Sequence, residues 1–182
     1  MMLEDQLLIW QLKGGDTDAF CQVYRRYRTD LLRLAALLLH DRVEAEDIVH
    51  DVFVSLAKSA EGLTLRKSLK GYLLTCVANA ARNRNRASQR RRAAGLDEAA
   101  TVPSPARTPE QWVTYSEQLE RWSGALAQLP YEQREAVVMH LRGGVKFGQI
   151  ARLQGVSVNT AKGRYRYALE KLRSVLNSEL ES

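Results

Sequence analysis

Apolar residues recur every three or four positions along most of this 182-residue chain. This spacing places apolar side chains on one face of a helix, and the sequence has no sustained alternation of the kind that predicts a strand. We therefore predict an all-α fold, with helices over residues 3–13, 17–40, 42–58, 69–92, 109–127, 131–142, 146–153 and 158–177.

Polar residues at the starts of these segments support the predicted boundaries. Asp16 follows two glycines and is a plausible N-cap, and Asp41 with Glu44 resembles a capping box. The second helix is expected to bury Phe20, Val23, Tyr24, Tyr27, Leu31, Leu34, Ala35 and Leu38, and the third Ala45, Ile48, Val49, Val52, Phe53 and Leu56.

One segment interrupts the helical pattern near the middle of the chain. Residues 93–108, AAGLDEAATVPSPART, are rich in Ala and Pro and almost free of large apolar groups. Such a segment cannot bury enough surface to offset its ordering entropy, so we predict a flexible linker. The chain then divides into two small helical domains, residues 1–92 and 109–182, joined by residues 93–108.

Charge is distributed unevenly between these segments. The net charge is +6 and the pI about 9.5, with Lys and Arg concentrated around residues 82–92 and 162–173. Between Val43 and Ala57 the chain has no Lys or Arg but carries Glu44, Glu46, Asp47 and Asp51. Clustered basic charge favours phosphate binding, because neutralised phosphates release counterions. Why a basic protein keeps one acidic helix depends on what the rest of the chain contacts.

Residues 149–172, QIARLQGVSVNTAKGRYRYALEKL, have the layout of a helix-turn-helix. Gly155 can supply a positive φ in the turn, and Ser157 can cap the second helix, whose inner face would include Val158. Gln154 stands where such units usually carry an apolar residue. An ordinary helical hairpin with a solvated basic face is the alternative interpretation. In a DNA-binding unit, the outer face of the second helix would present Asn159, Thr160, Lys162, Gly163, Arg164 and Arg166.

Residues 72–92, YLLTCVANAARNRNRASQRRR, begin as an apolar helix and become strongly basic. Arg82 and Arg86 can contact phosphates, while Asn79 and Asn83 can pair with exposed base edges. The loop at residues 59–68 lies just upstream and could form a pocket for an unstacked base. A solvated or non-specific basic patch is the alternative.

Four motifs occur in order along the chain: GDTDAFCQVYRRY, EAEDIVHDVF, YLLTCVANAARN and LPYEQREAVVMHLRGGVKFGQIARLQGVSVNTAKGRYRYAL. Together they closely resemble the extracytoplasmic-function sigma factors of bacterial RNA polymerase, a branch of the sigma-70 family. The resemblance covers residues 16–92 and 108–176. It implies a promoter-specificity subunit whose first domain binds and melts the −10 element and whose second domain reads the −35 element.

The resemblance also implies roles for individual residues. Lys162, Gly163 and Arg166 would face the −35 element. The acidic helix would dock on the clamp coiled coil of the largest subunit of core RNA polymerase. An anti-sigma factor is a further partner of many relatives. The implied −10 contacts are Gly62, Leu63, Leu65, Asn79, Arg82, Asn83 and Arg86, and the implied polymerase contacts are Glu44, Asp47, Ile48, His50 and Asp51.

Other classes of function find little support. His40, His50 and His140 have no metal-ligand spacing with Cys21 or Cys76, so we expect no metal or other cofactor, and both cysteines are expected to be small core residues. No glycine-rich phosphate loop or nucleophile–base pair points to an enzyme. Without a basic leader or an apolar run of about 20 residues, a cytoplasmic location is expected. A stand-alone helix-turn-helix regulator, which would bind duplex DNA without polymerase, remains the alternative.

Overall fold

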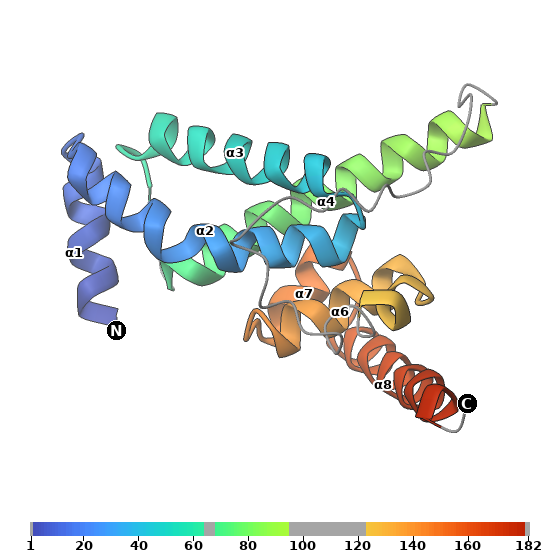
Figure 1. Ribbon diagram of the computed structural model, residues 1–182. Helices are drawn as coiled ribbons and strands as arrows, with labels where there is room; N and C mark the ends of the chain where they lie inside the picture. Colours follow the sequence, from blue (N-terminus) through green and yellow to red (C-terminus); the bar gives the residue numbers. More distant parts are fainter. Residues whose placement is uncertain (1, 64–67, 95–122, 181–182) are drawn as a thin grey trace.

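The computed structural model describes residues 2–63, 68–94 and 123–180 (Figure 1). Within these ranges the regular secondary structure is entirely helical, which confirms the all-α prediction. Leu65 and most of the segments predicted as a linker (93–108) and a helix (109–127) lie outside the described residues, although residues 123–127 are helical.

The first domain is built from α1 (Met2–Lys13), α2 (Thr17–Leu39), α3 (Arg42–Ser59) and α4 (Leu69–Ala93). Helices α2 and α3 run side by side, α4 packs against both, and the basic end of α4 extends beyond them (Figure 1). All six residues predicted for the buried face of α3 are buried, from Ala45 to Leu56. This face forms a core with Val23, Leu31 and Leu38 of α2.

The second domain contains α6 (Tyr131–Leu141), α7 (Phe147–Gln154) and α8 (Val158–Leu180). These helices pack on one another, and α6 also packs against α2. As a result, the buried apolar residues of both domains form one continuous cluster. The two domains are therefore in contact, an arrangement that the sequence did not reveal.

The predicted caps are present. The Asp16 carboxylate accepts hydrogen bonds from the backbone N–H groups of Asp18 and Ala19 at 2.8 and 3.1 Å. Asp41 accepts one from the N–H of Glu44 at 3.0 Å. These bonds satisfy N–H groups that have no partner within the helix, which fixes the first residues of α2 and α3.

Helix α1 is held by a buried carboxylate. One oxygen of Asp5 accepts a hydrogen bond from the Tyr27 hydroxyl at 2.8 Å, and the other accepts one from the backbone N–H of Leu69 at 3.4 Å. Burial, followed by the hydrogen bond to Asp5, raises the pKa of Tyr27 to about 12. The hydroxyl therefore remains a donor at neutral pH, and Asp5 joins α1 to α2 and to the start of α4.

Three predictions about the core are wrong. Tyr24 is 37% exposed because its ring lies at the rim of the core, 4.7 Å from that of Phe53. Val158 is 43% exposed because it is the first residue of α8, with no preceding turn to cover it. Cys21 is exposed because it shares a polar face of α2 with Arg25.

Among the helices that the structure describes, none has the length and apolar character that a membrane-spanning helix requires.

Candidate nucleic-acid and polymerase interfaces

The turn between α7 and α8 has helix-turn-helix geometry. Gly155 adopts φ 65° and ψ 34°, the left-handed conformation that ends α7, and the N–H of Val156 returns to the carbonyl of Ala151 at 3.0 Å. Ser157 then caps α8 by accepting from the N–H of Thr160 at 3.0 Å. The predicted roles of Gly155 and Ser157 are confirmed.

A cluster of three rings fixes α8 against α6 and α7. His140 stacks on Phe147 with ring centroids 4.1 Å apart, and Tyr165 meets the edges of both rings at 5.1 and 5.2 Å. On the same side of α8, Ala161 and Ala168 are fully buried. This packing directs the opposite side of α8 to solvent.

Four of the six residues predicted for −35 recognition are exposed on α8: Asn159, Thr160, Lys162 and Arg166. Gly163 and Arg164 are half-buried, and Arg164 donates a hydrogen bond to the side-chain oxygen of Gln154 at 2.7 Å. The exposed four form a polar and basic face of the type that hydrogen-bonds phosphates and base edges.

Those residues predicted for −10 recognition that lie on α4 differ in exposure. Asn79, Asn83 and Arg86 are exposed at spacings of four and three residues, so they share one face of the helix. Arg82 neighbours this face, three residues after Asn79 and four before Arg86, but it is buried, with its guanidinium bonded to Glu135 of the second domain. The expectation that Arg82 is available to DNA therefore does not hold in this arrangement of the domains.

The loop before α4 is only partly described. Gly62 is exposed, whereas Leu63 is buried in the core and cannot offer its side chain to a base in this arrangement. Ser68 ends the loop by capping α4 through a hydrogen bond from the N–H of Gly71 at 3.2 Å.

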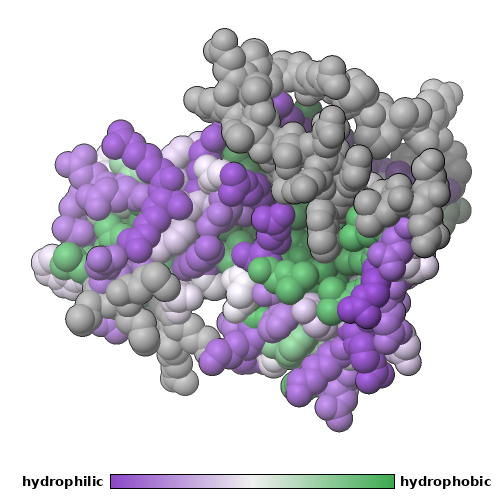
Figure 2. Space-filling model, turned by 60° about the horizontal axis from the view of Figure 1, so that its bottom comes forward, coloured by the Kyte–Doolittle hydropathy of each residue, from purple (hydrophilic) through white to green (hydrophobic). Residues whose placement is uncertain are grey.

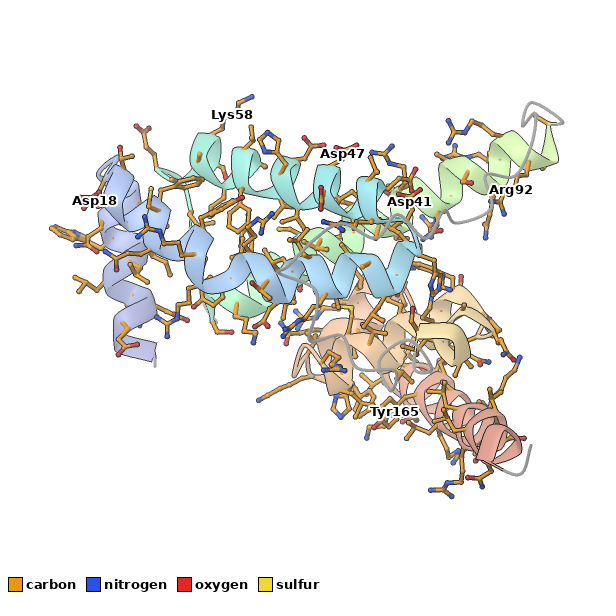
Figure 3. All side chains as sticks on the ribbon, viewed as in Figure 1. Asp18, Asp41, Asp47, Lys58, Arg92 and Tyr165 are labelled. Carbon is orange, nitrogen blue, oxygen red and sulfur yellow. The ribbon has the colours of Figure 1, made fainter. Side chains whose placement is uncertain are left out.

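Helix α3 presents its acidic residues outward. Asp47, His50 and Asp51 are exposed, and Figure 3 shows Asp47 on the side of α3 that faces away from α2. Glu44 is half-buried and lies 3.8 Å from Arg84. Ile48 is 3% exposed, so this predicted polymerase contact is instead part of the core beneath the acidic surface.

A polar cluster between the two domains was missed by sequence reasoning. Its centre is Glu135, which is fully buried and bonded to Arg82, Tyr131 and Gln154. Burial raises the pKa of Glu135, and these three partners each oppose the rise. In the sequence, Gln154 indicated such a cluster, because it stands at a position that usually carries an apolar residue.

One face of the molecule carries both hydrophilic and apolar residues. Figure 2 shows one face of the molecule on which hydrophilic residues dominate around a smaller apolar area. In the part of the chain that the structure describes, no group of three or more His, Cys, Asp or Glu residues is placed to hold a metal ion.

Comparisons with known proteins agree with these features. The family model Sigma-70 region 2 matches residues 23–91, and Sigma-70, region 4 matches residues 119–172. The chain is 31% identical over 163 residues to the ECF RNA polymerase sigma factor SigM of Mycobacterium tuberculosis, covering 90% of this chain and 80% of the relative. It is 29% identical to the RNA polymerase sigma factor CarQ of Myxococcus xanthus, covering 94% and 96% of the two chains.

Solved structures show the same fold. The sigma factor RpoE in complex with the anti-sigma factor NepR from Bartonella quintana matches with a TM-score of 0.70 and 25% identity, over 87% of this chain and 96% of that one. CnrH in complex with the cytosolic domain of CnrY matches with a TM-score of 0.68 and 24% identity, over 96% and 97%. The chain therefore belongs to the extracytoplasmic-function sigma factors, sigma-70-family subunits that direct bacterial RNA polymerase to promoters for transcription initiation.

Proposed function

We propose that this sigma factor divides its contacts among three helices: α3 binds core RNA polymerase, α4 binds the −10 element, and α8 reads the −35 element. The observation that carries this proposal is the separation of charge. Exposed carboxylates gather on α3, while exposed Arg, Lys and Asn side chains gather on α4 and α8. Separating the two signs lets one small protein bind a protein and DNA at once and disfavours the wrong pairing.

The −10 contacts are assigned to the face of α4 that carries Asn79, Asn83 and Arg86. Asn79 would line a pocket for a flipped base together with the loop around Gly62. Strand opening then draws on the binding energy of unstacked bases, which requires no metal and no nucleotide. We therefore assign the protein no cofactor and no catalytic step of its own, and catalysis belongs to the polymerase.

The −35 contacts are assigned to the exposed face of α8. Lys162 and Arg166 would meet phosphates and base edges when the helix enters the major groove. The two functional units are residues 1–92 and 109–182, joined by residues 93–108.

The polymerase contact is assigned to Asp47 and Asp51, which are spaced four residues apart on α3. They would meet basic residues on the clamp coiled coil of the largest subunit. His50 lies beside them, and Glu44 contributes from the edge of this surface. Since relatives RpoE and CnrH have been solved with NepR and CnrY, we also assign an anti-sigma protein as a partner class, and the cytoplasm as the site of action.

Purified core polymerase tests the polymerase contact directly. The wild-type chain should co-elute with the core enzyme in gel filtration and produce new transcription start sites on genomic templates. Asp47→Lys with Asp51→Lys should weaken co-elution without loss of helical content. The control is Asp18→Lys with Glu170→Lys, which makes the same change in net charge at two exposed carboxylates away from α3.

Each outcome has a clear meaning. Full co-elution of the α3 variant would remove α3 from the polymerase interface. Failure of the wild-type chain to co-elute, combined with tight binding to duplex DNA alone, would indicate a free-standing regulator.

A further inference from the structure

Gly163 lies at a position of α8 where glycine is unfavourable. Of the glycines in α1 to α4 and α6 to α8, it is the one that lies beyond the first turn of its helix. A glycine inside a helix lowers stability, because its backbone loses more conformational freedom on folding than that of any other residue. The second turn of α8 therefore carries a residue that helix formation alone does not favour.

Packing within the protein does not require this glycine. A Cβ on Gly163 would meet nothing within 4 Å beyond the adjoining backbone of α8. By contrast, a Cβ on Gly143 would lie 2.6 Å from the carbonyl oxygen of Met139, so the fold requires glycine there. A glycine that faces open space lets a ligand approach the backbone closely. The reason for Gly163 is therefore sought outside the protein.

Four exposed side chains surround the open space above Gly163. Residues three and four positions away are neighbours on a helix surface, and for Gly163 these are Asn159, Thr160, Arg166 and Tyr167. At about 1.5 Å per residue, Thr160 and Tyr167 are about 10 Å apart along the helix axis. The missing side chain thus leaves a notch, with Gly163 as its floor and Thr160 and Tyr167 at its two ends.

The floor and the ends of this notch offer mainly apolar contact. The Thr160 hydroxyl is hydrogen-bonded to that of Ser157 at 2.8 Å, so its methyl group is the part left for another contact. Tyr167 is 56% exposed, and the guanidinium carbon of Arg166 lies 5.5 Å from its ring centre. The N–H of Gly163 lies beyond the first four residues of α8 and has its partner within the helix. The notch therefore suits an apolar group better than a phosphate oxygen.

The major groove of DNA presents one apolar group that fits such a notch. Thymine carries a C5-methyl group, and the other bases lack it. Proteins recognise this methyl group by apolar contact, from threonine methyl groups and aromatic rings among others. The thymine O4 lies next to the methyl group and accepts hydrogen bonds, and Arg166 borders the notch as a donor.

We propose that Thr160, Gly163 and Tyr167 form a specificity site for the C5-methyl group of one thymine in the −35 element. The inference rests on the proposed function, because it requires α8 to lie in the major groove of that element. Gly163 contributes by lacking a side chain, since the methyl group of the base occupies the space that a Cβ would take. Tyr167 contributes its exposed ring as a wall of the site.

The experiment removes the methyl group from the DNA and leaves the base pairing unchanged. The holoenzyme is assembled from core polymerase and the full chain, and its promoter is found by start-site mapping. Each thymine of the −35 element, on either strand, is replaced in turn by deoxyuridine, which pairs with adenine but lacks the methyl group. The affinity of the holoenzyme for each duplex is measured by competition against the unmodified promoter.

Two variants change the site, and each has a matched control. Gly163→Ala fills the notch with a methyl group, and Gly124→Ala adds the same group in open space outside α8. Tyr167→Ala removes the ring, and Tyr167→Phe keeps it. Because Ala favours a helix more than Gly does, Gly163→Ala is expected to fold. Circular dichroism establishes that each variant is folded.

In the wild-type holoenzyme, we expect deoxyuridine at one −35 position to lower affinity about fourfold, as for one methyl group removed from an apolar contact. At that position, deoxyuridine should have little effect in Gly163→Ala and in Tyr167→Ala, because the contact is already lost. It should keep the wild-type effect in Gly124→Ala and in Tyr167→Phe.

Two results would overturn the specificity site. One is equal affinity of the wild-type holoenzyme for every deoxyuridine duplex, and the other is a full methyl effect in Gly163→Ala or Tyr167→Ala. The proposed function is tested separately, by replacing A·T pairs of the −35 element with G·C pairs. If these replacements lower affinity while deoxyuridine does not, α8 reads the element without this site. If neither change has an effect, the assignment of α8 to the −35 element fails as well.

Discussion

At the scale of single residues, Arg166 is well placed to read DNA. It is exposed on α8, and its guanidinium carbon lies 5.5 Å from the ring centre of Tyr167. This contact limits the positions that the long side chain samples, which lowers the entropy lost when it binds. No residue of the described core packs over the face of α8 that it shares with Lys162.

Replacing Arg166 with Ala should weaken −35 recognition by about 1–3 kcal/mol if the side chain reads a base. The measurement is transcription and filter binding of the holoenzyme on a promoter found by start-site mapping and on single-base variants of its −35 element. Arg173→Ala, at an exposed position further along α8, is the control. An equal loss on every sequence would assign Arg166 to a phosphate.

Asp5 shows how one buried side chain connects three helices. Asp5→Ala leaves the Tyr27 hydroxyl and the Leu69 N–H without their acceptor, so we expect the free energy of unfolding to fall by about 1–3 kcal/mol. The measurement is urea unfolding followed by circular dichroism. Glu4→Ala, which breaks the exposed pair with Arg26, should leave the free energy of unfolding nearly unchanged. Equal costs for both changes would deny Asp5 this role.

At the scale of elements, the helix-turn-helix offers a pair of glycines with opposite expectations. Gly155 has φ 65°, where a Cβ costs about 1–2 kcal/mol, so Gly155→Ala should lower the free energy of unfolding of the second domain. Gly148 lies within α7, and a Cβ there would meet nothing within 4 Å. Gly148→Ala should therefore raise the free energy of unfolding by about 0.5–1 kcal/mol. The midpoint temperature of thermal unfolding should fall for Gly155→Ala and rise for Gly148→Ala. A shift of both midpoints in the same direction would contradict this assignment of the turn.

Most elements could be predicted from sequence because their determinants are local. The capping carboxylates of Asp16 and Asp41 act on N–H groups two or three residues away. The apolar stripe of α3 identifies its buried face without reference to a partner. The errors occurred where burial depends on the rim of the core, as at Tyr24, or on the end of a helix, as at Val158.

At the scale of the whole molecule, sequence reasoning met a different obstacle. Arg82 bonds a residue 53 positions away, and Arg134 bonds one 96 positions away. No local sequence pattern predicts contacts between residues so far apart. Arg82 was therefore assigned to DNA because it belongs to a basic run, although on α4 it faces the other domain. Family resemblance gives positions of contact, but it does not state which arrangement of the domains makes them available.

The contact between the two domains, where Arg134 of α6 meets His40 at the end of α2, predicts a dependence on pH. Burial, reinforced by the neighbouring Arg134 charge, lowers the pKa of His40 from 6.5 to about 4. In an open form with a solvated imidazole the pKa returns toward 6.5. Between these values the open form binds a proton that the closed form does not, so the closed form loses stability as pH falls from about 6.5 to 4. Well above pH 6.5 the imidazole is neutral in both forms and contributes no pH dependence.

The measurement is fluorescence energy transfer between dyes on Cys21 of α2 and on an introduced cysteine, Ser174→Cys of α8, in a chain that also carries Cys76→Ala to prevent labelling there. The energy transfer should decrease on acidification through this window. His40→Asn tests the assignment, because Asn tolerates the left-handed conformation and does not titrate. Glu135 also lies at the contact between the domains, and its raised pKa acts in the opposite direction. Because Glu135 is present in both chains, the difference between their pH profiles isolates the effect of the imidazole. A protonated His40 would be repelled by the Arg134 cation in this buried site, whereas Asn carries no charge. On acidification, energy transfer should therefore decrease less in the His40→Asn variant than in the parent chain. Superimposable pH profiles for the two chains would show that His40 does not couple protonation to domain closure.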